Sequence, residues 1–227
     1  MTGPDISVLC PTRKRPALLK RSFDSLMEKS SGLYQVEFLA ACDPDDAEFP
    51  RGIFDPCPQA RVLVANERYG YGRLHEYYNR LARIASGKWL FLWNDDAFMR
   101  TQDWDRVIMD RPDHQVLWPE VNHHWTGNLF PVWPRAWSEA MGHVSLSPNV
   151  DRWISEVGRQ QGLEFRIPVI IYHERADITG LNDDKTYREG RFVMGNADDS
   201  QFHSAENREA RARDIVTVDD LVYGAPR

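Results

Sequence analysis

The sequence has no apolar run long enough to cross a membrane, and it contains little cysteine. A transmembrane helix needs ~20 consecutive apolar residues, and no stretch approaches that length. The first residues, MTGPDISVLCPTRKRP, also lack the apolar core of a signal peptide. The 3 cysteines, Cys10, Cys42 and Cys57, form no CxxC pair, which is typical of free thiols in a reducing compartment. We therefore expect a cytoplasmic protein without a membrane span.

Several motifs of well-known enzyme classes are absent as well. The stretch RYGYGR has glycines but is not GxGxxG, and no Walker lysine pattern occurs, which argues against a dinucleotide dehydrogenase and against a P-loop enzyme. Neither a GxSxG elbow nor an HExxH motif is found. The net charge is −6, so the composition does not indicate a nucleic-acid groove.

The sequence does contain alternating strand and helix patterns. With 227 residues, 42% of them hydrophobic, it is long enough for one large domain with a substantial core. The alternation up to residue 98 predicts a single Rossmann-like α/β domain of three layers, α/β/α, with a mostly parallel central sheet. The expected strands are 5–10, 36–42, 61–65 and 89–93, the expected helices are 17–29 and 73–85, and an irregular loop is expected over 47–59.

The second half predicts helices at 104–109, 134–141 and 150–161, strands at 115–118 and 165–172, and strand and loop structure over 122–133. His123 and His124 are adjacent, so on a strand they would point to opposite faces and would not form a metal pair. The chain is polar from residue 177 on, with a charged helix expected at 199–213. We expect this tail to pack over the site or to be partly mobile.

The most informative stretch is KWLFLWNDDAF, residues 88–98. Its bulky apolar run predicts a buried strand, which stops at Asn94, Asp95 and Asp96. Unpaired carboxylates are too costly to bury, so these acids are expected at the carboxyl end of the strand, where open α/β sheets bind ligands. Adjacent carboxylates there suit a hard divalent cation; the alternative is a polar turn that caps the next helix.

Two other expected strands end in similar residues. Asp43 follows the second strand and His173 follows the last. In a parallel sheet these ends share an edge, so Asp43 would hydrogen-bond a base or ribose, and His173 would add a nitrogen ligand for Mn²⁺. The alternative for Asp43 is a turn residue before Pro44, and the alternative for His173 is a histidine at a strand end whose hydrogen bonds are made within the fold.

The basic turn after the first strand, Pro11-Thr12-Arg13-Lys14-Arg15, belongs to the same edge. Cations beside a helix N-terminus would clamp a diphosphate, whereas the alternative is a solvated loop. Asp151, in the stretch NVDRW at a helix start, is either a helix cap or a general base that faces the site.

Together these residues resemble a glycosyltransferase of the GT-A fold, closest to the family 2 type. The resemblance is carried by ISVLCPTRKRP, by Asp43, and by the helix with Asn79 that leads into ASGKWLFLWNDD. The last is similar to that family's A-x-G-x-x-hydrophobic-D-x-D passage, with Asn94 at the first acid position. The similarity covers residues 6–98 and extends more weakly through FPVWPRAWSEAMG, NVDRW and IIYHERAD.

The resemblance implies a nucleotide-sugar-binding half at 1–98, an acceptor half at 99–176 and a tail at 177–227. It implies a metal-dependent transfer of a hexosyl or pentosyl group from a nucleotide-diphosphate sugar to the hydroxyl group of a small molecule, a glycan or a modified nucleic acid. Asp96 and His173 would hold Mn²⁺ or Mg²⁺, and Asp151 would be the base of an inverting reaction. The implied donor site contains Pro11, Thr12, Arg13, Arg15, Asp43, Asn79, Asn94 and Asp95.

Two other functions remain open at this point. A nucleotidyltransferase that makes nucleotide sugars would share the sheet and the metal acids, but it usually has a glycine-rich loop after the first strand, and TRKRP contains no glycine. A non-catalytic nucleotide- or carbohydrate-binding domain on the same scaffold would be favoured if Asp96 pointed away from the cleft.

Overall fold

The computed structural model describes residues 3–46, 51–54, 57–122 and 127–224, and of residues 51 and 191–199 only the backbone. The expected loop at 47–59 is therefore described only in part, and the adjacent histidines His123 and His124 lie outside the described residues. No helix among the described residues is long and apolar enough to cross a bilayer.

A single sheet of 8 strands forms the centre of the molecule, in the order β3-β2-β1-β4-β7-β6-β8-β5. Its first half is parallel, because β1 pairs with β2 and β4, and β2 pairs with β3, in the same direction. The strands are β1 Ile6–Pro11, β2 Val36–Cys42, β3 Ala60–Val64, β4 Trp89–Leu92, β5 Ala97–Met99, β6 Val116–Val121, β7 Val132–Pro134 and β8 Glu164–His173.

The expectation of a mostly parallel sheet is wrong for the second half, so the sheet is mixed. Strand β7 runs antiparallel to both β4 and β6, and β5 runs antiparallel to β8, while β6 and β8 pair in parallel. Parallel neighbours need a crossover of about a dozen residues or more, usually with a helix. Residues 122–131 between β6 and β7 are too short for one, so the chain turns back on itself.

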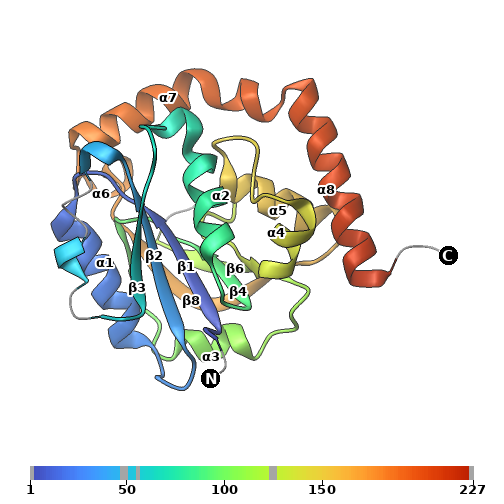
Figure 1. Cartoon of the computed structure of the whole chain (residues 1–227), viewed down its shortest axis with the longest axis horizontal. Helices are drawn as coiled ribbons and strands as arrows, with labels where there is room; N and C mark the ends of the chain where they lie inside the picture. Colours follow the sequence, from blue (N-terminus) through green and yellow to red (C-terminus); the bar gives the residue numbers. More distant parts are fainter. Residues whose placement is uncertain (1–2, 47–50, 55–56, 123–126, 225–227) are drawn as a thin grey trace.

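The helices cover both faces of this sheet. Helix α2 packs on β1 and β2, α4 packs on β7, and α5 packs on β6 and β8. Helix α1 contacts β5, and α3 contacts β8 (Figure 1). They are α1 Pro16–Lys29, α2 Leu74–Ile84, α3 Trp104–Met109, α4 Arg135–Met141, α5 Val150–Gln160, α6 Ala176–Thr179, α7 Lys185–Phe202 and α8 Ala205–Tyr223. Most bounds up to residue 173 agree with the sequence prediction within two residues, but β5 was not expected, and β6 extends three residues further than the strand expected at 115–118.

The core explains why the central strands form. All residues of β2 and β4 are buried, which is typical of strands covered on both faces. Aromatic rings fill the space beneath α1, where Phe91 packs against Trp93 and Trp104. The indole N–H of Trp93 donates to Ser22 Oγ on α1 (2.7 Å), so this layer is fixed by a buried hydrogen bond as well as by packing.

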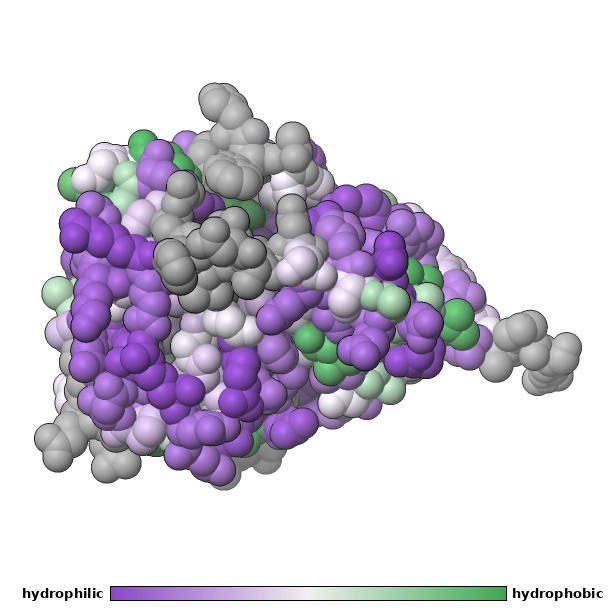
Figure 2. Space-filling view, turned by 90° about the horizontal axis from the view of Figure 1, so that it is seen from above, coloured by the Kyte–Doolittle hydropathy of each residue, from purple (hydrophilic) through white to green (hydrophobic). Residues whose placement is uncertain are grey.

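The C-terminal segment differs most from the sequence prediction. The sequence predicted a polar segment with one charged helix at 199–213, whereas the structure has two long helices, α7 and α8. Helix α7 crosses the upper end of the sheet in Figure 1, and α8 descends beside α4 and α5. The residues around this upper end are mainly hydrophilic, as Figure 2 shows from above.

Candidate functional site

The three polar residues after β4 are held in place at the carboxyl end of the parallel strands. Asp95 is 5% exposed and accepts hydrogen bonds from Thr12 Oγ1 at Oδ2 (2.8 Å) and from Arg15 Nη1 at Oδ1 (3.1 Å). Burial raises the pKa of Asp95 to about 6. The positive charge of Arg15 lowers this pKa, and the negative charge of the adjacent Asp96 raises it. Thr12 and Arg15, both from the basic turn, therefore fix this carboxylate.

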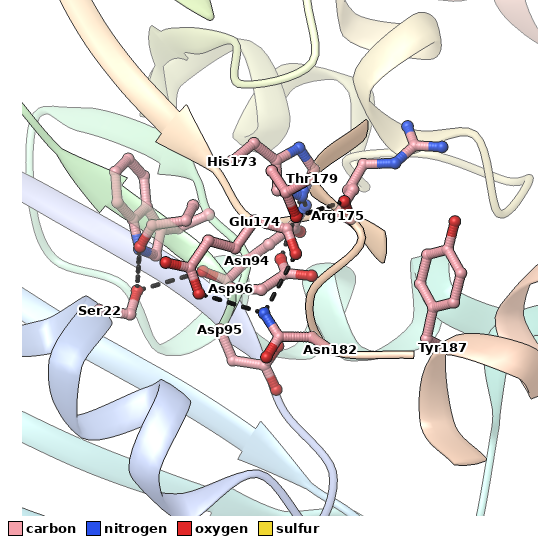
Figure 3. Close-up of polar contacts among 12 residues, drawn as sticks. Ser22, Asn94, Asp95, Asp96, His173, Glu174, Arg175, Thr179, Asn182 and Tyr187 are labelled. Atoms are coloured by element: carbon pink, nitrogen blue, oxygen red, sulfur yellow. Dashed lines mark hydrogen bonds and ion pairs between the residues drawn. The ribbon is translucent and has the colours of Figure 1, made fainter. Parts of the chain in front are cut away.

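Asp96 faces the end of β8. Its Oδ1 is 3.0 Å from His173 Nε2, and its Oδ2 is 3.6 Å from Arg15 Nη1. Burial opposes ionisation, but His173 and Arg15 together lower the pKa of Asp96 below its ordinary value. The neighbouring Asn94 accepts a hydrogen bond from the hydroxyl of Tyr78 (3.3 Å), and its amide lies 3.5 Å from His173 Nε2. Figure 3 shows Asn94, Asp95, Asp96 and His173 gathered at this point.

Asp96 and His173 carry side chains of the kinds that bind a divalent cation. Asp96 Oδ1 and His173 Nε2 are in hydrogen-bond contact at 3.0 Å, and a carboxylate oxygen and an imidazole nitrogen are both ligand types that Mn²⁺ accepts. Among the residues that the structure describes, no group of three or more His, Cys, Asp and Glu side chains could hold a metal ion. A cation here would therefore take its other ligands from water and from a bound ligand.

Asp43 forms the second corner of the site. It is 2% exposed and bonded to Arg13 and to the hydroxyl of Tyr77, and Arg68 Nε lies 4.0 Å away. Arg13 also holds Asp45 through two hydrogen bonds (2.9 and 3.0 Å). The basic turn after β1 thus joins the end of β2 to the end of β4, so the structure brings together the three strand ends at Asp43, 94–96 and His173.

Two predicted site residues lie in other settings. Asn79, on α2, donates to Ser145 O (2.9 Å) and accepts from the backbone N–H groups of Val144 and Ser145 (2.7 and 3.2 Å). Its amide therefore holds the loop that precedes α5. Asp151 is half-buried in the first turn of α5. Its charge contributes, after burial and Cys10, to the raised pKa of Tyr78, the α2 residue whose hydroxyl donates to Asn94.

Sequence reasoning missed the residues that the C-terminal segment adds. Asp184 binds Arg15 through Nε–Oδ2 (2.7 Å) and Nη2–Oδ1 (2.8 Å), and Asn182 donates to both the backbone and the side chain of Glu174 (3.1 and 3.2 Å). Tyr71 is half-buried at the same place, and desolvation raises its pKa. The run Asn182-Asp183-Asp184 was only a polar stretch in the sequence, and no local pattern ties it to a residue 169 positions away.

This edge of the sheet combines clustered cations with clustered acids. Arg13, Arg15 and Arg68 approach Asp43, Asp95 and Asp96 from one side, while His173 approaches from β8. Guanidinium groups bind phosphate oxygens in pairs, and the acids bind either sugar hydroxyls or a divalent cation. The arrangement is suited to a ligand that carries both a phosphate and a polyol.

Comparison with known proteins gives a fold but no family. The sequence matches no protein-family model and no curated protein. The structure is similar to S. aureus TarS 1–349 in complex with UDP, with a TM-score of 0.59, 10% identity, and coverage of 96% of this chain and 81% of that chain. A second structure of TarS 1–349 gives a TM-score of 0.54 and 11% identity over the same shares. The likeness shows the fold alone, and it confirms the glycosyltransferase-type α/β fold predicted from the sequence.

Proposed function

We propose that this protein is a metal-dependent glycosyltransferase that takes its sugar from a nucleotide-diphosphate donor. The observation that carries the proposal is the junction of three strand ends at Arg13 and Arg15, where arginines and buried acids face one edge of the sheet. The similar fold of TarS was solved with UDP, which supports a nucleoside diphosphate as the ligand class.

Each part of the donor has a partner of suitable chemistry. Asp43 is the acceptor for the N–H or O–H groups of a base or ribose, with Pro11 and Thr12 as the backbone beside it. Arg13 and Arg15 bind the diphosphate, whose charge they neutralise through paired hydrogen bonds. Asn94 and Asp95 complete the site next to the sugar. Asn79 does not contact the donor but holds the loop before α5 in place.

Asp96 and His173 would hold the divalent cation, Mn²⁺ or Mg²⁺. When bound, the cation supplies positive charge beside the oxygens of the leaving diphosphate. In the transfer, the bond between the anomeric carbon and the diphosphate oxygen breaks, and a bond forms to the acceptor hydroxyl oxygen. Arg15 stabilises the negative charge that develops on the leaving group. Asp151 is the candidate base that removes the hydroxyl proton in an inverting reaction.

The test is a turnover assay over a panel of nucleotide sugars with Mn²⁺, in which release of the nucleoside diphosphate is measured with and without acceptors. We expect one donor to be consumed, and Asp96→Asn to abolish consumption. The matched control is Asp113→Asn, since Asp113 is an exposed carboxylate paired only with Lys88 among its described ion-pair contacts. No consumption of any donor would contradict the proposal, and formation of a nucleotide sugar from a sugar phosphate and a nucleoside triphosphate would favour a nucleotidyltransferase instead.

A further inference from the structure

Residues 182–190, which we call the acidic strap, cross the edge of the sheet where the donor is proposed to bind. At one end, Asn182 bonds to Glu174 beyond β8, as Figure 3 shows. In the middle, Thr186 Oγ1 donates to the backbone oxygen of Arg13 (3.3 Å). At the other end, Gly190 lies so close to the ring of Tyr71 that a Cβ atom would come within 2.7 Å of Tyr71 Cζ. The strap therefore contacts the whole proposed donor edge.

Two carboxylates of the strap are bound to arginines of this edge. Asp184 forms a paired contact with Arg15 (2.7 and 2.8 Å), which is the geometry that guanidinium groups also offer to phosphate. Glu189 is bonded to Arg68, whose Nε lies 4.0 Å from Asp43 Oδ2. The strap thus places one carboxylate near Asp95 and another near Asp43.

We propose that the acidic strap occupies the phosphate positions of the ligand-free protein, and that the donor displaces Asp184 from Arg15 and Glu189 from Arg68. This inference rests on the proposed function, and it adds Arg68 to the anion-binding residues. Arg15 already faces Asp95 and Asp96 as well as Asp184. A diphosphate would bring further negative charge to the same guanidinium, so the release of Asp184 removes a repulsion as well as an obstruction.

The exposure of the two partners indicates which one moves. In the first pair, the side chain of Arg15 is 5% exposed and that of Asp184 is 39% exposed. In the second pair, Arg68 is 46% exposed and Glu189 is 32% exposed, so exposure does not distinguish these two partners. Arg15 is fixed by the strand ends beneath it, and the carboxylates come from the solvent side. Asp184 is therefore the partner that gives way, while Arg15 stays in place to receive a phosphate.

Asp184 has a second role that a substitution can separate from the first. Its Oδ1 accepts the backbone N–H of Tyr187 (2.8 Å), and its backbone oxygen accepts the N–H of Arg188 (3.0 Å), so it caps the N-terminus of α7. Asparagine caps helices as well as aspartate does. Asp184→Asn therefore keeps the helix cap and removes the negative charge that faces the Arg15 guanidinium.

The experiment compares the wild type, Asp184→Asn and the control Asp183→Asn by isothermal titration with pyrophosphate and with UDP, in the presence of Mn²⁺. Asp183 is exposed and pairs with Arg188 on the strap's outer side. We expect Asp184→Asn to bind both anions on the order of tenfold more tightly, because a charge-assisted contact no longer competes. Asp183→Asn should match the wild type, and Glu189→Gln should tighten UDP binding in the same direction.

Equal or weaker anion binding by Asp184→Asn, in a protein whose melting temperature is unchanged, would overturn the inference while leaving the donor site intact. Unchanged affinity in Glu189→Gln would remove Arg68 from the anion site. If neither anion binds to the wild type or to any variant, the proposed function fails and the inference fails with it.

Discussion

The buried carboxylate Asp95 makes a quantitative prediction about stability and pH. Its pKa is about 6 in the folded protein, against 3.8 for an unperturbed aspartate. Between these values the folded protein holds the proton more strongly than the unfolded chain, so the stability contributed by this group falls as the pH rises through the window. Ionisation of Asp95 in the folded protein therefore costs about 3 kcal/mol once the pH is well above 6.

The perturbation is Asp95→Asn, which keeps the shape of the side chain and removes its titration. Urea unfolding, followed by far-UV circular dichroism, would give the free energy of unfolding of both proteins at several pH values. About a third of the free-energy cost of ionising Asp95 already applies at pH 4.5. The free energy of unfolding of the wild type should therefore fall by about 2 kcal/mol relative to that of the variant between pH 4.5 and 7.5. Titrating groups that do not interact with Asp95, such as the half-buried His75 whose pKa is lowered by burial, cancel in this difference.

The result that would refute the reasoning is a stability difference that does not change with pH, or one that grows in favour of the wild type as the pH rises. Either outcome would mean that Asp95 ionises at least as easily as an exposed aspartate. The site at the end of β4 would then be open to water, in conflict with its 5% exposure.

Two further predictions concern the framework around the site. Gly87→Ala should destabilise the protein by roughly 3 kcal/mol or more, because the added Cβ would lie 2.6 Å from the backbone nitrogen of Ser7. If urea unfolding showed a loss of stability below about 1 kcal/mol, that result would contradict the close approach of Gly87 to β1. Asn79→Ala should cost at least about 2 kcal/mol, since it leaves the backbone partners of its amide in the loop before α5 unsatisfied. The same substitution should not weaken UDP binding beyond what its effect on stability explains, and a specific loss of affinity would return Asn79 to direct donor contact.

The first half of the fold could be predicted because its signals are local. The apolar run of β4 stops at two acids, and Pro16 at the start of α1 follows a basic turn, so the strand end and the helix start are both encoded within a few residues. The ends of β1, β2 and β4 then meet at one edge because the strands are parallel, which brings Arg13 to Asp43.

The second half could not be predicted in the same way, because strand direction depends on connections rather than on residue patterns. β5 has only three residues, too few to show a periodicity, and it is held by pairing with β8, where Ala97 faces His173. The contact between Arg15 and Asp184 likewise depends on the path of the chain around the whole domain. A polar run such as 182–184 predicts only an exposed segment until its partner is known.

The most direct test of the central claim is a thermal-shift titration of the wild-type protein with nucleoside diphosphates, with and without Mn²⁺. A ligand that binds only the folded state raises the melting temperature by mass action. We expect a rise that depends on one nucleoside diphosphate together with Mn²⁺ and that is lost in Asp96→Asn. The absence of a shift with every diphosphate, at concentrations up to the millimolar range, would contradict a donor site at the ends of β1, β2 and β4.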